Sequence, residues 1–379
     1  MKIEPFKLER YFARHEFTAP WLLCSSDCES MSVRDLLEME PGASDALASL
    51  WLGYTESLGS PELRQAISEL HEIITADDVM VHSGAQEAIF NFMNAAVEPG
   101  DHVIVLSPCY QSLSEVAVAA GAEVSSWNLH PISAREDTRN SWHLDIDELK
   151  SLLKKNTRLV VVNFPHNPTG FLPSREFFAE LSALSDLHGF TIFSDEVYRG
   201  LEYNSADRLP CMADINPRAI SLGVMSKTYG LAGLRIGWIA TKNSAVYQQM
   251  AAFKDYTTIC NSALSEFLAA LALRNAPAIA ERNLGIINGN LQLLNRFFQE
   301  FRHLFTWYEP KAGPIAFPGL KMGDCRKFCS ELIEKAGVLL LPGNLYNENL
   351  NCFRIGFGRA NMPQALEKFR EYLLSGTRS

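Results

Sequence analysis

The sequence predicts an α/β protein with a mostly parallel central sheet. Three observations predict this class. Short apolar runs rich in β-branched residues alternate with helical patterns along the chain, the order that parallel sheets require. Several of these runs stop at a polar or glycine-containing turn, as at Val81-His82-Ser83-Gly84. The 379 residues are also enough for a large domain flanked by helices and a second, smaller domain.

The composition is that of an ordinary soluble globular protein, with 47% hydrophobic and 21% charged residues. The formal net charge of −10 is spread along the chain. It argues against a protein that binds nucleic acid or an anionic membrane. No apolar run approaches the roughly 20 residues that span a bilayer. The first residues, Met1 to Lys7, lack an apolar signal core, so we expect a cytoplasmic protein.

The eight cysteines are scattered among apolar neighbours, as is typical of reduced thiols. Cys24 and Cys28, and likewise Cys325 and Cys329, are separated by three residues. No histidine ligand motif accompanies either pair, and the second pair lies one turn apart in an expected helix. We therefore expect no metal site.

The first forty residues show little periodicity and carry several aromatic side chains. We interpret them as an arm that packs on another part of the structure, such as a partner subunit. A short strand from Leu22 then ends in the polar turn Ser25-Ser26-Asp27-Cys28. The aromatic residues of the arm are Phe6, Tyr11, Phe12, Phe17 and Trp21.

Two helix starts follow the arm. Ser60 is suited to cap a helix that has Pro61 in its first turn. The strand Val79 to Ser83 then runs into Gly84, which permits close approach of the backbone. The free N–H groups of the helix that begins there suit an anion.

Three further strands each present a polar or aromatic residue at the end of an apolar run. The strand from Asp101 ends at a Ser-Pro turn before Tyr110, and the strand from Arg158 to Asn163 is stopped by two prolines. The strand from Phe190 delivers Asp195 at its carboxyl end, where open parallel sheets place their ligands.

Lys227 lies in a glycine-rich turn between the apolar segments Ala219 to Val224 and Ile236 to Ala240. Poor solvation in such surroundings lowers the pKa of a lysine and favours the neutral amine that attacks a carbonyl. Ser226 and Arg235 add a hydroxyl group and a bidentate cation, which suit a phosphate.

The carboxyl-terminal third begins with two helical patterns, at 254–273 and 288–301. A short strand at 313–318 and an apolar run at 338–341 follow, and the chain then presents Arg354 inside Phe353-Arg354-Ile355-Gly356.

Ser226-Lys227-Thr228, with Gly233-Leu234-Arg235-Ile236-Gly237-Trp238, resembles the Schiff-base lysine segment of the class I/II aminotransferases. These are fold-type I enzymes that depend on pyridoxal 5′-phosphate (PLP). Asn167-Pro168-Thr169-Gly170 and Asp195-Glu196-Val197-Tyr198 resemble further motifs of the family, in the family's order. The resemblance implies a large PLP-binding domain over residues 41–285. A smaller α+β domain would comprise 286–379 together with the arm, 1–40.

The resemblance also implies a role for each matching residue. Lys227 would carry the cofactor and move the Cα proton, and Asp195 would bind the pyridine nitrogen. The other residues would hold the two ends of the cofactor and the substrate. Asn167 and Tyr198 would donate to O3′ of the ring, and Tyr198 would be catalytic together with Lys227 and Asp195. Tyr110 and Val197 would cover the two faces of the ring, and the amides of Ala85 and Gln86 with Ser226 and Arg235 would bind the phosphate. Arg354 would bind the substrate carboxylate, and Asn167 would also contact the substrate.

Two implied contacts concern less specific motifs. Tyr54, before Pro61-Glu62-Leu63-Arg64, matches a tyrosine that reaches the phosphate of a neighbouring subunit, so the enzyme would be a homodimer at least. Ser26 lies where the family commonly has a glycine near the substrate carboxylate. This departure leaves the contact of Ser26 with the substrate open.

The first functional hypothesis is therefore an aminotransferase that uses an L-amino acid and a 2-oxo acid. A lyase, a decarboxylase or a cyclising synthase would use the same residues and is the alternative. A non-catalytic PLP-binding regulator ranks lower, because its relatives carry a DNA-binding domain for which we expect no room before Leu22. The glycines near residue 230 form no dinucleotide fingerprint, which argues against a nicotinamide enzyme.

Overall fold

The computed structural model describes residues 2–132, 141–346 and 349–376. Its largest element is an eight-stranded sheet in the order β2-β9-β8-β7-β6-β3-β4-β5. Six strands run in one direction, and β9 and β5 oppose them, since both pair antiparallel with their neighbours. The predicted mostly parallel sheet is thus confirmed. The strands are β2 (Val79–His82), β3 (His102–Ser107), β4 (Glu123–Ile132), β5 (Ser141–Leu144), β6 (Thr157–Asn163), β7 (Thr191–Asp195), β8 (Ile220–Val224) and β9 (Gly237–Ala240).

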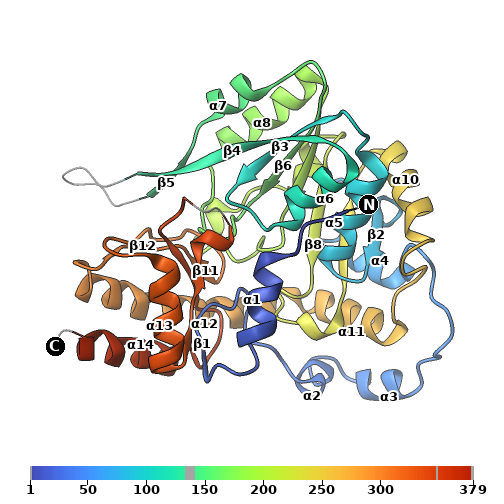
Figure 1. Cartoon of the computed structure of the whole chain (residues 1–379). Coiled ribbons are helices and arrows are strands. Elements are labelled where there is room, and N and C mark those ends of the chain that lie inside the picture. Colours follow the sequence, from blue (N-terminus) through green and yellow to red (C-terminus); the bar gives the residue numbers. More distant parts are fainter. Residues whose placement is uncertain (1, 133–140, 347–348, 377–379) are drawn as a thin grey trace.

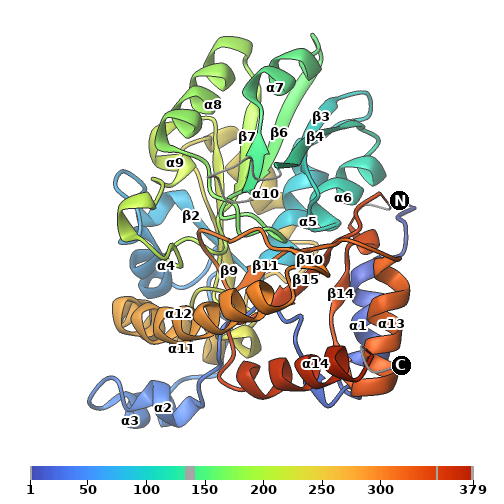
Figure 2. The ribbon, with the colours of Figure 1, turned by 90° about the vertical axis from the view of Figure 1, so that its left-hand side faces the viewer.

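Helices cover both faces of this sheet (Figures 1 and 2). Alternate residues of a strand point to opposite faces, so each buried strand serves two hydrophobic clusters. In β3, Val103 and Val105 join one cluster, whereas Ile104 and Leu106 join another. The helices of this part are α4 (Pro61–Ser68), α5 (Ala85–Ala96), α6 (Ser112–Ala120), α7 (Ile146–Leu152), α8 (Arg175–His188), α9 (Met212–Ile215), α10 (Ser244–Lys254) and α11 (Ala263–Arg274), with 3-10 turns at Ala76–Asp78, Ser205–Asp207 and Ala232–Leu234.

A smaller α+β part is built mainly from the carboxyl-terminal residues. The 25-residue helix α12 (Ala276–Glu300) leads into it and spans the boundary predicted at residue 285. Its other elements are β10 (Phe305–Thr306), β11 (Ile315–Ala316), β12 (Gly319–Leu320), α13 (Cys325–Ala336), β13 (Val338–Leu339), β14 (Leu341–Pro342), a 3-10 turn (Gly343–Leu345), β15 (Phe353–Gly356) and α14 (Met362–Gly376).

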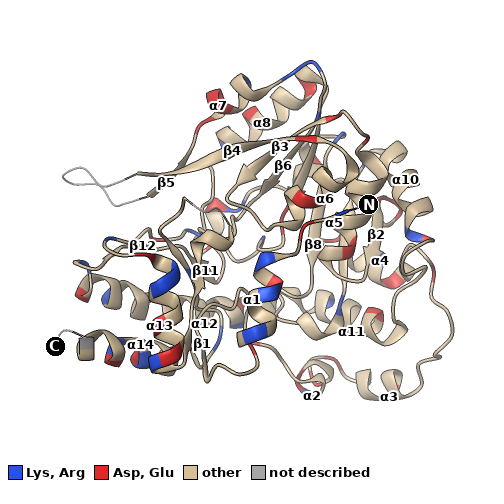
Figure 3. Cartoon of the chain, viewed as in Figure 1, with Lys and Arg blue, Asp and Glu red and all other residues tan. Residues whose placement is uncertain are grey.

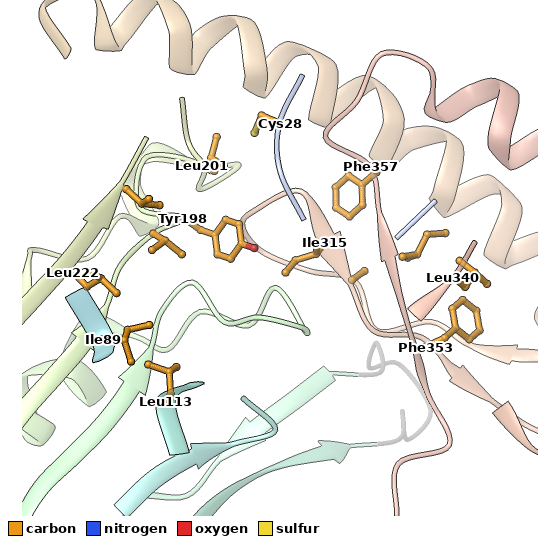
Figure 4. Close-up of a cluster of buried hydrophobic side chains, with 14 of the residues drawn as sticks. Cys28, Ile89, Leu113, Tyr198, Leu201, Leu222, Ile315, Leu340, Phe353 and Phe357 are labelled. Atoms are coloured by element: carbon orange, nitrogen blue, oxygen red, sulfur yellow. The ribbon is translucent and has the colours of Figure 1, made fainter. Parts of the chain in front are cut away.

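One hydrophobic cluster joins the large and small parts (Figure 4). Ile89 of α5 and Leu222 of β8 belong to it, and so do Ile315 of β11 and Phe353 of β15. Tyr198 lies between these groups in the view. The two parts therefore share packed side chains, and this shared packing positions the residues that each contributes to the space between them.

The amino-terminal arm packs on its own chain. Helix α1 (Lys7–His15) places Leu8 in a cluster with Leu339 and Leu341 of the small part. Strand β1 (Trp21–Leu22) pairs with β13. The expectation that the arm packs on another element is met here without a partner subunit, while Phe17 is 92% exposed. Two short helices, α2 (Val33–Leu37) and α3 (Ala43–Ala48), follow the arm.

The helix predicted from Lys254 to Leu273 is wrong in its first part. Lys254 ends α10, and α11 begins only at Ala263, where the Ser262 hydroxyl accepts a hydrogen bond from the Ser265 N–H. Between the two helices Ile259 has a φ of 62°. The Lys254 ammonium donates to the Thr258 hydroxyl and to the Ile259 carbonyl. These contacts favour a turn, which apolar spacing does not reveal.

The charged stretch at residues 130–142, with Arg135, Glu136, Asp137 and Arg139, is one for which the sequence predicts a solvated excursion. Most of it lies outside the described residues; β4 extends to Ile132 and β5 begins at Ser141. Within the part of the chain that the structure describes, no helix combines the length and the apolar character that crossing a membrane requires.

Candidate active site

A cavity of about 370 Å³ lies at the carboxyl ends of β6, β7 and β8, facing α1 and the small part. Twelve of the thirteen predicted site residues line it. They come from eight separate segments of the chain, so the fold gathers residues that the sequence keeps far apart. The twelve are Ser26, Ala85, Gln86, Tyr110, Asn167, Asp195, Val197, Tyr198, Ser226, Lys227, Arg235 and Arg354.

Lys227 follows β8 and is half-buried. Its Nζ donates a hydrogen bond to the Ser26 Oγ at 2.8 Å. Burial lowers the pKa of Lys227, and the Asp27 carboxylate opposes this with a smaller effect. Both the low solvation and the neutral hydroxyl partner favour an uncharged amine, the form that can attack a carbonyl carbon.

Asp195 ends β7 and is 6% exposed. Its Oδ1 accepts a hydrogen bond from the Val197 N–H at 3.2 Å. Burial raises the pKa of Asp195 to about 7, while this hydrogen bond and Lys227 lower it to a smaller extent. A carboxylate in such a position is stabilised by a cation brought in by a ligand. The protonated ring nitrogen of PLP is a cation of this kind.

Asn167 and Tyr198 face the cavity from two loops. The Asn167 Oδ1 accepts hydrogen bonds from the Arg354 Nη1 at 3.3 Å and from the Tyr346 hydroxyl at 3.1 Å. Because its oxygen is engaged in this way, the Asn167 amide group is oriented and its nitrogen remains a donor. The Tyr198 hydroxyl donates to the Ser26 carbonyl at 3.0 Å. Burial raises the pKa of Tyr198, so this hydroxyl stays protonated.

The start of α5 forms a cradle suited to a phosphate. Gly84 has a φ of 86°, and the first turn of α5 has no capping side chain. A Cβ atom at Gly84 would lie 2.5 Å from the Arg235 Nη2, so glycine lets the guanidinium approach the helix start. Ala85, Gln86 and Ser226 line the same cavity. Free N–H groups, a helix dipole and a guanidinium together favour a phosphate dianion.

Arg354 of β15 is 2% exposed and is held in place from several directions. Its Nε and Nη2 both donate to the Cys24 carbonyl, at 3.0 and 2.8 Å. Its Nη1 donates to the Tyr346 hydroxyl at 2.7 Å. This arrangement fixes the guanidinium plane at the cavity wall and leaves one Nη2 N–H, with the cationic charge, to bind a carboxylate.

Arg359, a second arginine close to Arg354 in the sequence and so another candidate for the carboxylate, also lines the cavity. It forms a two-point ion pair with Asp27, with distances of 3.0 and 2.8 Å between nitrogen and oxygen. The positive charge of Arg359 is therefore already paired with a carboxylate of the same chain.

Tyr54 lies apart from the cavity, and its side chain is 89% exposed. It lines a separate hollow together with Leu52 and residues 260–264. A single chain thus does not bring Tyr54 to the predicted phosphate site, and a contact across subunits stays a prediction.

Sequence reasoning did not assign several residues that line or brace the cavity. Glu9, Phe12 and Glu16 of the arm face it. Glu9 also accepts a hydrogen bond from the Tyr110 hydroxyl at 3.3 Å. The spacing of Leu8 and Phe12 is a helical signal, but nothing in the sequence shows that the helix folds back over Lys227.

His166 braces the Asn167 loop and has no direct place in the cavity. Its Nδ1 lies 2.7 Å from the Thr169 hydroxyl, and its Nε2 lies 2.8 Å from the Pro108 carbonyl oxygen. Burial lowers the pKa of His166 to about 3, so the ring is neutral at physiological pH. It joins the loop after β6 to the loop that presents Tyr110.

The cysteine pairs fit the interpretation as thiols. The Cys325 and Cys329 sulfurs lie 3.9 Å apart within α13, and the Cys325 thiol donates to the Cys352 carbonyl. Elsewhere among the described residues, possible ligand atoms of His71, Cys211 and Asp214 lie within 4.8 Å of one another. Asp214 is already engaged there by the His71 ring and by the Ile73 N–H.

These features define a class of protein. One cavity between the two parts of the α/β fold is lined by a poorly solvated lysine and by a buried carboxylate that a cationic ligand would stabilise. The same cavity contains a site suited to an anion and a guanidinium held in a fixed direction. The cavity chemistry fits PLP, with its ring nitrogen, aldehyde and phosphate.

Residues 21–369 match the family of class I and II aminotransferases, and the chain belongs to that family. Its fold is that of the PLP-dependent fold-type I enzymes, and PLP is the cofactor. Capreomycidine synthase of Streptomyces vinaceus is 30% identical over 371 residues, which cover 97% of this chain and 93% of that protein.

Two solved structures are also similar over nearly their whole length. A PLP-dependent aminotransferase from Streptococcus suis superimposes with a TM-score of 0.91 at 29% identity, covering 99% of both chains. The PLP-dependent cyclase OrfR gives a TM-score of 0.88 at 28% identity, covering 99% of this chain and 98% of that one.

Proposed function

We propose that this chain is a PLP-dependent aminotransferase that moves the amino group of an L-amino acid to a 2-oxo acid. The presence of Lys227, Asp195 and Arg354 in one cavity carries the proposal. The cavity places a half-buried amine with a lowered pKa together with a buried carboxylate and a buried guanidinium. Similarity to an aminotransferase over 99% of the chain supports the same reaction.

Bound PLP supplies the electron sink that makes the Cα proton of an amino acid acidic. Lys227 holds the cofactor and then moves that proton, for which a neutral amine is needed. Asp195 stabilises positive charge at the ring nitrogen. Asn167 donates a hydrogen bond to the ring oxygen, and Tyr198 donates a second one after its hydroxyl turns away from the Ser26 carbonyl.

Arg354 binds the α-carboxylate of the substrate in this proposal. Its other hydrogen bonds, to Cys24, Tyr346 and Asn167, already fix the direction of its guanidinium. The Arg354–Asn167 contact also joins the carboxylate site to the residue proposed to bind the ring oxygen. The binding of the substrate carboxylate at Arg354 therefore influences the position of Asn167 beside the cofactor ring.

A cyclising synthase or lyase is the second candidate. The hydroxyl of Ser26 contacts the Lys227 amine at a position where the family commonly has glycine. Such a hydroxyl can hold the lysine in a position from which it protonates a leaving group. The chain is also similar, over 97–99% of its length, to a capreomycidine synthase and to a PLP-dependent cyclase.

We also propose a homodimer in which Tyr54 contacts the cofactor phosphate of the second subunit. Trp51, Leu52 and Tyr54 are 79%, 72% and 89% exposed. Leu264, in the same hollow as Leu52 and Tyr54, is 45% exposed. Apolar side chains gathered in this way favour burial against another protein surface.

A single-turnover half-reaction tests the proposed reaction. Cofactor-loaded enzyme is mixed with single L-amino acids, while the absorbance of the cofactor and the masses of the products are followed. An aminotransferase yields the matching 2-oxo acid and an aminated cofactor, and a second 2-oxo acid restores the starting absorbance. Release of ammonia, carbon dioxide or a cyclised product, with the cofactor unchanged, establishes the second candidate instead.

A further inference from the structure

Most of the charged side chains that line the cavity can be assigned a partner of opposite charge. Among the described residues, four basic and four acidic side chains line it. Three basic groups have partners in the proposed function: Lys227 holds the cofactor, Arg235 its phosphate and Arg354 the substrate carboxylate. Arg359 is paired with Asp27. Asp195 is matched by the ring nitrogen, which leaves two carboxylates of the arm, Glu9 and Glu16.

Glu9 and Glu16 reach the cavity from the same side. They are seven residues apart, close to two turns of a helix, and Phe12 of the same helix also lines the cavity. Glu9 lies in α1, and Glu16 follows its last residue, His15. In Figure 1, α1 lies between the large part and the small part. The arm therefore presents two acidic groups along one wall of the cavity.

Neither carboxylate forms an ion pair with a lysine or arginine of the described chain. Glu9 accepts one hydrogen bond, from the Tyr110 hydroxyl. Glu16 is half-buried, and burial raises its pKa, with Arg359 opposing this to a smaller extent. Partial burial of a carboxylate without a cation costs free energy, which a positively charged ligand would recover.

Other acidic residues are scattered along the whole chain, as the red segments of Figure 3 show, and many of them are exposed. Glu9 and Glu16 differ from these because they share a cavity with the proposed carboxylate site. A second carboxylate on a substrate would meet them with repulsion. The one further guanidinium at hand, that of Arg359, is already paired with Asp27.

We propose that Glu9 and Glu16 bind a positively charged side chain of the substrate, so that the enzyme acts on a cationic L-amino acid. This inference rests on the proposed function, which places the α-carboxylate at Arg354. The substrate then spans the cavity with its carboxylate at Arg354 and its side-chain ammonium or guanidinium at the arm.

Non-reacting ligands test this proposal without relying on turnover. 5-Guanidinopentanoate has the carboxylate and the guanidinium of arginine but lacks the amine. 5-Ureidopentanoate is its neutral counterpart of nearly equal shape. A second pair, 6-(trimethylammonio)hexanoate and hexanoate, compares an ammonium that cannot react with PLP with no charge. Isothermal titration of the cofactor-loaded enzyme gives the dissociation constant for each ligand.

We expect the guanidino ligand to bind at least about tenfold more tightly than the ureido ligand, as is usual for a charge-assisted contact. The double variant Glu9→Gln/Glu16→Gln should reduce this ratio to about threefold or less. Glutamine retains an acceptor for Tyr110, which protects the fold. The single variant Glu16→Gln should give an intermediate ratio, and the Glu16 carboxylate accepts no hydrogen bond from the described residues.

Glu4→Gln is the matched control, because Glu4 belongs to the same arm but is exposed and lies outside the cavity. Its ligand ratio should equal that of the wild type. A ratio near one in the wild type, or an unchanged ratio in the double variant, overturns the proposal. If the half-reaction proceeds with neutral amino acids alone, the proposed function stands while this inference fails. If the cationic ligands bind selectively but no amino acid reacts, this inference stands while the proposed function fails.

Discussion

Asp195 illustrates how a single residue links stability to cofactor binding. Its carboxylate is buried, and its pKa is raised to about 7. In an unfolded chain the same group ionises near pH 4. Between these two pH values the folded protein binds more protons than the unfolded one, so this group makes folding less favourable as pH rises from about 4 to 7.

The first prediction therefore concerns Asp195→Asn in cofactor-free protein. Relative to this variant, the wild type should lose on the order of a few kcal/mol of unfolding free energy between pH 4 and pH 7. Urea unfolding at several pH values measures the difference. Burial also lowers the pKa of His82 and of His166 to about 3, and the comparison cancels their contribution to the pH dependence because both proteins contain them. Loading with PLP should flatten the difference, because a cationic ring nitrogen stabilises the carboxylate. Parallel curves for the two cofactor-free proteins would contradict the raised pKa.

The second prediction concerns Lys227→Ala. Loss of the amine should abolish the covalent attachment of the cofactor and lower the turnover by several orders of magnitude. Borohydride reduction followed by mass spectrometry of the intact chain measures the attachment. Lys335→Ala, at a helix surface, should retain the reducible adduct. A reduced adduct of full yield in Lys227→Ala would show that another lysine holds PLP.

At the residue scale, motif residues were the easiest to predict. Lys227, Asp195 and Arg354 stand in short patterns whose chemistry is local, and all three face the cavity. Glu9 and Glu16 stand in no such pattern. Their place depends on the packing of Leu8 against Leu339, a contact between residues more than 300 positions apart. Hydrophobic packing of this kind has no local signature.

At the scale of elements, the start of α5 is the most sensitive feature. Gly84→Ala, the third prediction, should weaken PLP binding by at least about tenfold, because a side chain would be strained at this φ and would displace Arg235. Fluorescence titration of the cofactor-free protein with PLP measures the effect. Gly289→Ala is the control, since a Cβ atom there meets nothing within 4 Å and alanine favours the helix. Equal affinities in the two variants would argue against a phosphate at Gly84.

Strands were predicted more accurately than helices. Most buried strands of the central sheet are short apolar runs that end at, or within two residues of, a polar side chain, so their limits can be read from the sequence. The expected helix from Lys254 failed because side-chain contacts to the backbone, such as that of Lys254 with Ile259, form a turn. Apolar spacing is insensitive to such hydrogen bonds.

At the scale of the whole molecule, the fourth prediction tests the proposed dimer. Leu52→Glu should place a charge in the apolar surface and shift the protein toward monomer, as measured by sedimentation or light scattering. Tyr54→Phe should leave the dimer intact but speed the loss of PLP severalfold, because it removes only a hydroxyl group. Both variants should retain the fold, since the two side chains are exposed.

A monomeric wild type would contradict the dimer itself. An unchanged rate of PLP loss in a dimeric Tyr54→Phe protein would contradict only the contact across subunits. The sequence suggested this contact by resemblance, but one chain cannot test it, because Tyr54 lies apart from its own cavity.

The position of α1 has a further consequence for how this enzyme can diversify. The arm is held by hydrogen bonds from the Lys7 N–H to the Gln111 side chain and from that side chain to the Pro5 carbonyl, and by the packing of Leu8. The groups proposed for catalysis all lie after residue 25. With Glu9 and Glu16 in their proposed role, recognition of the substrate side chain and the chemistry are encoded in separate stretches of the gene. We expect that exchange of the amino-terminal codons up to Glu16 redirects the enzyme toward new substrates while its reaction stays the same.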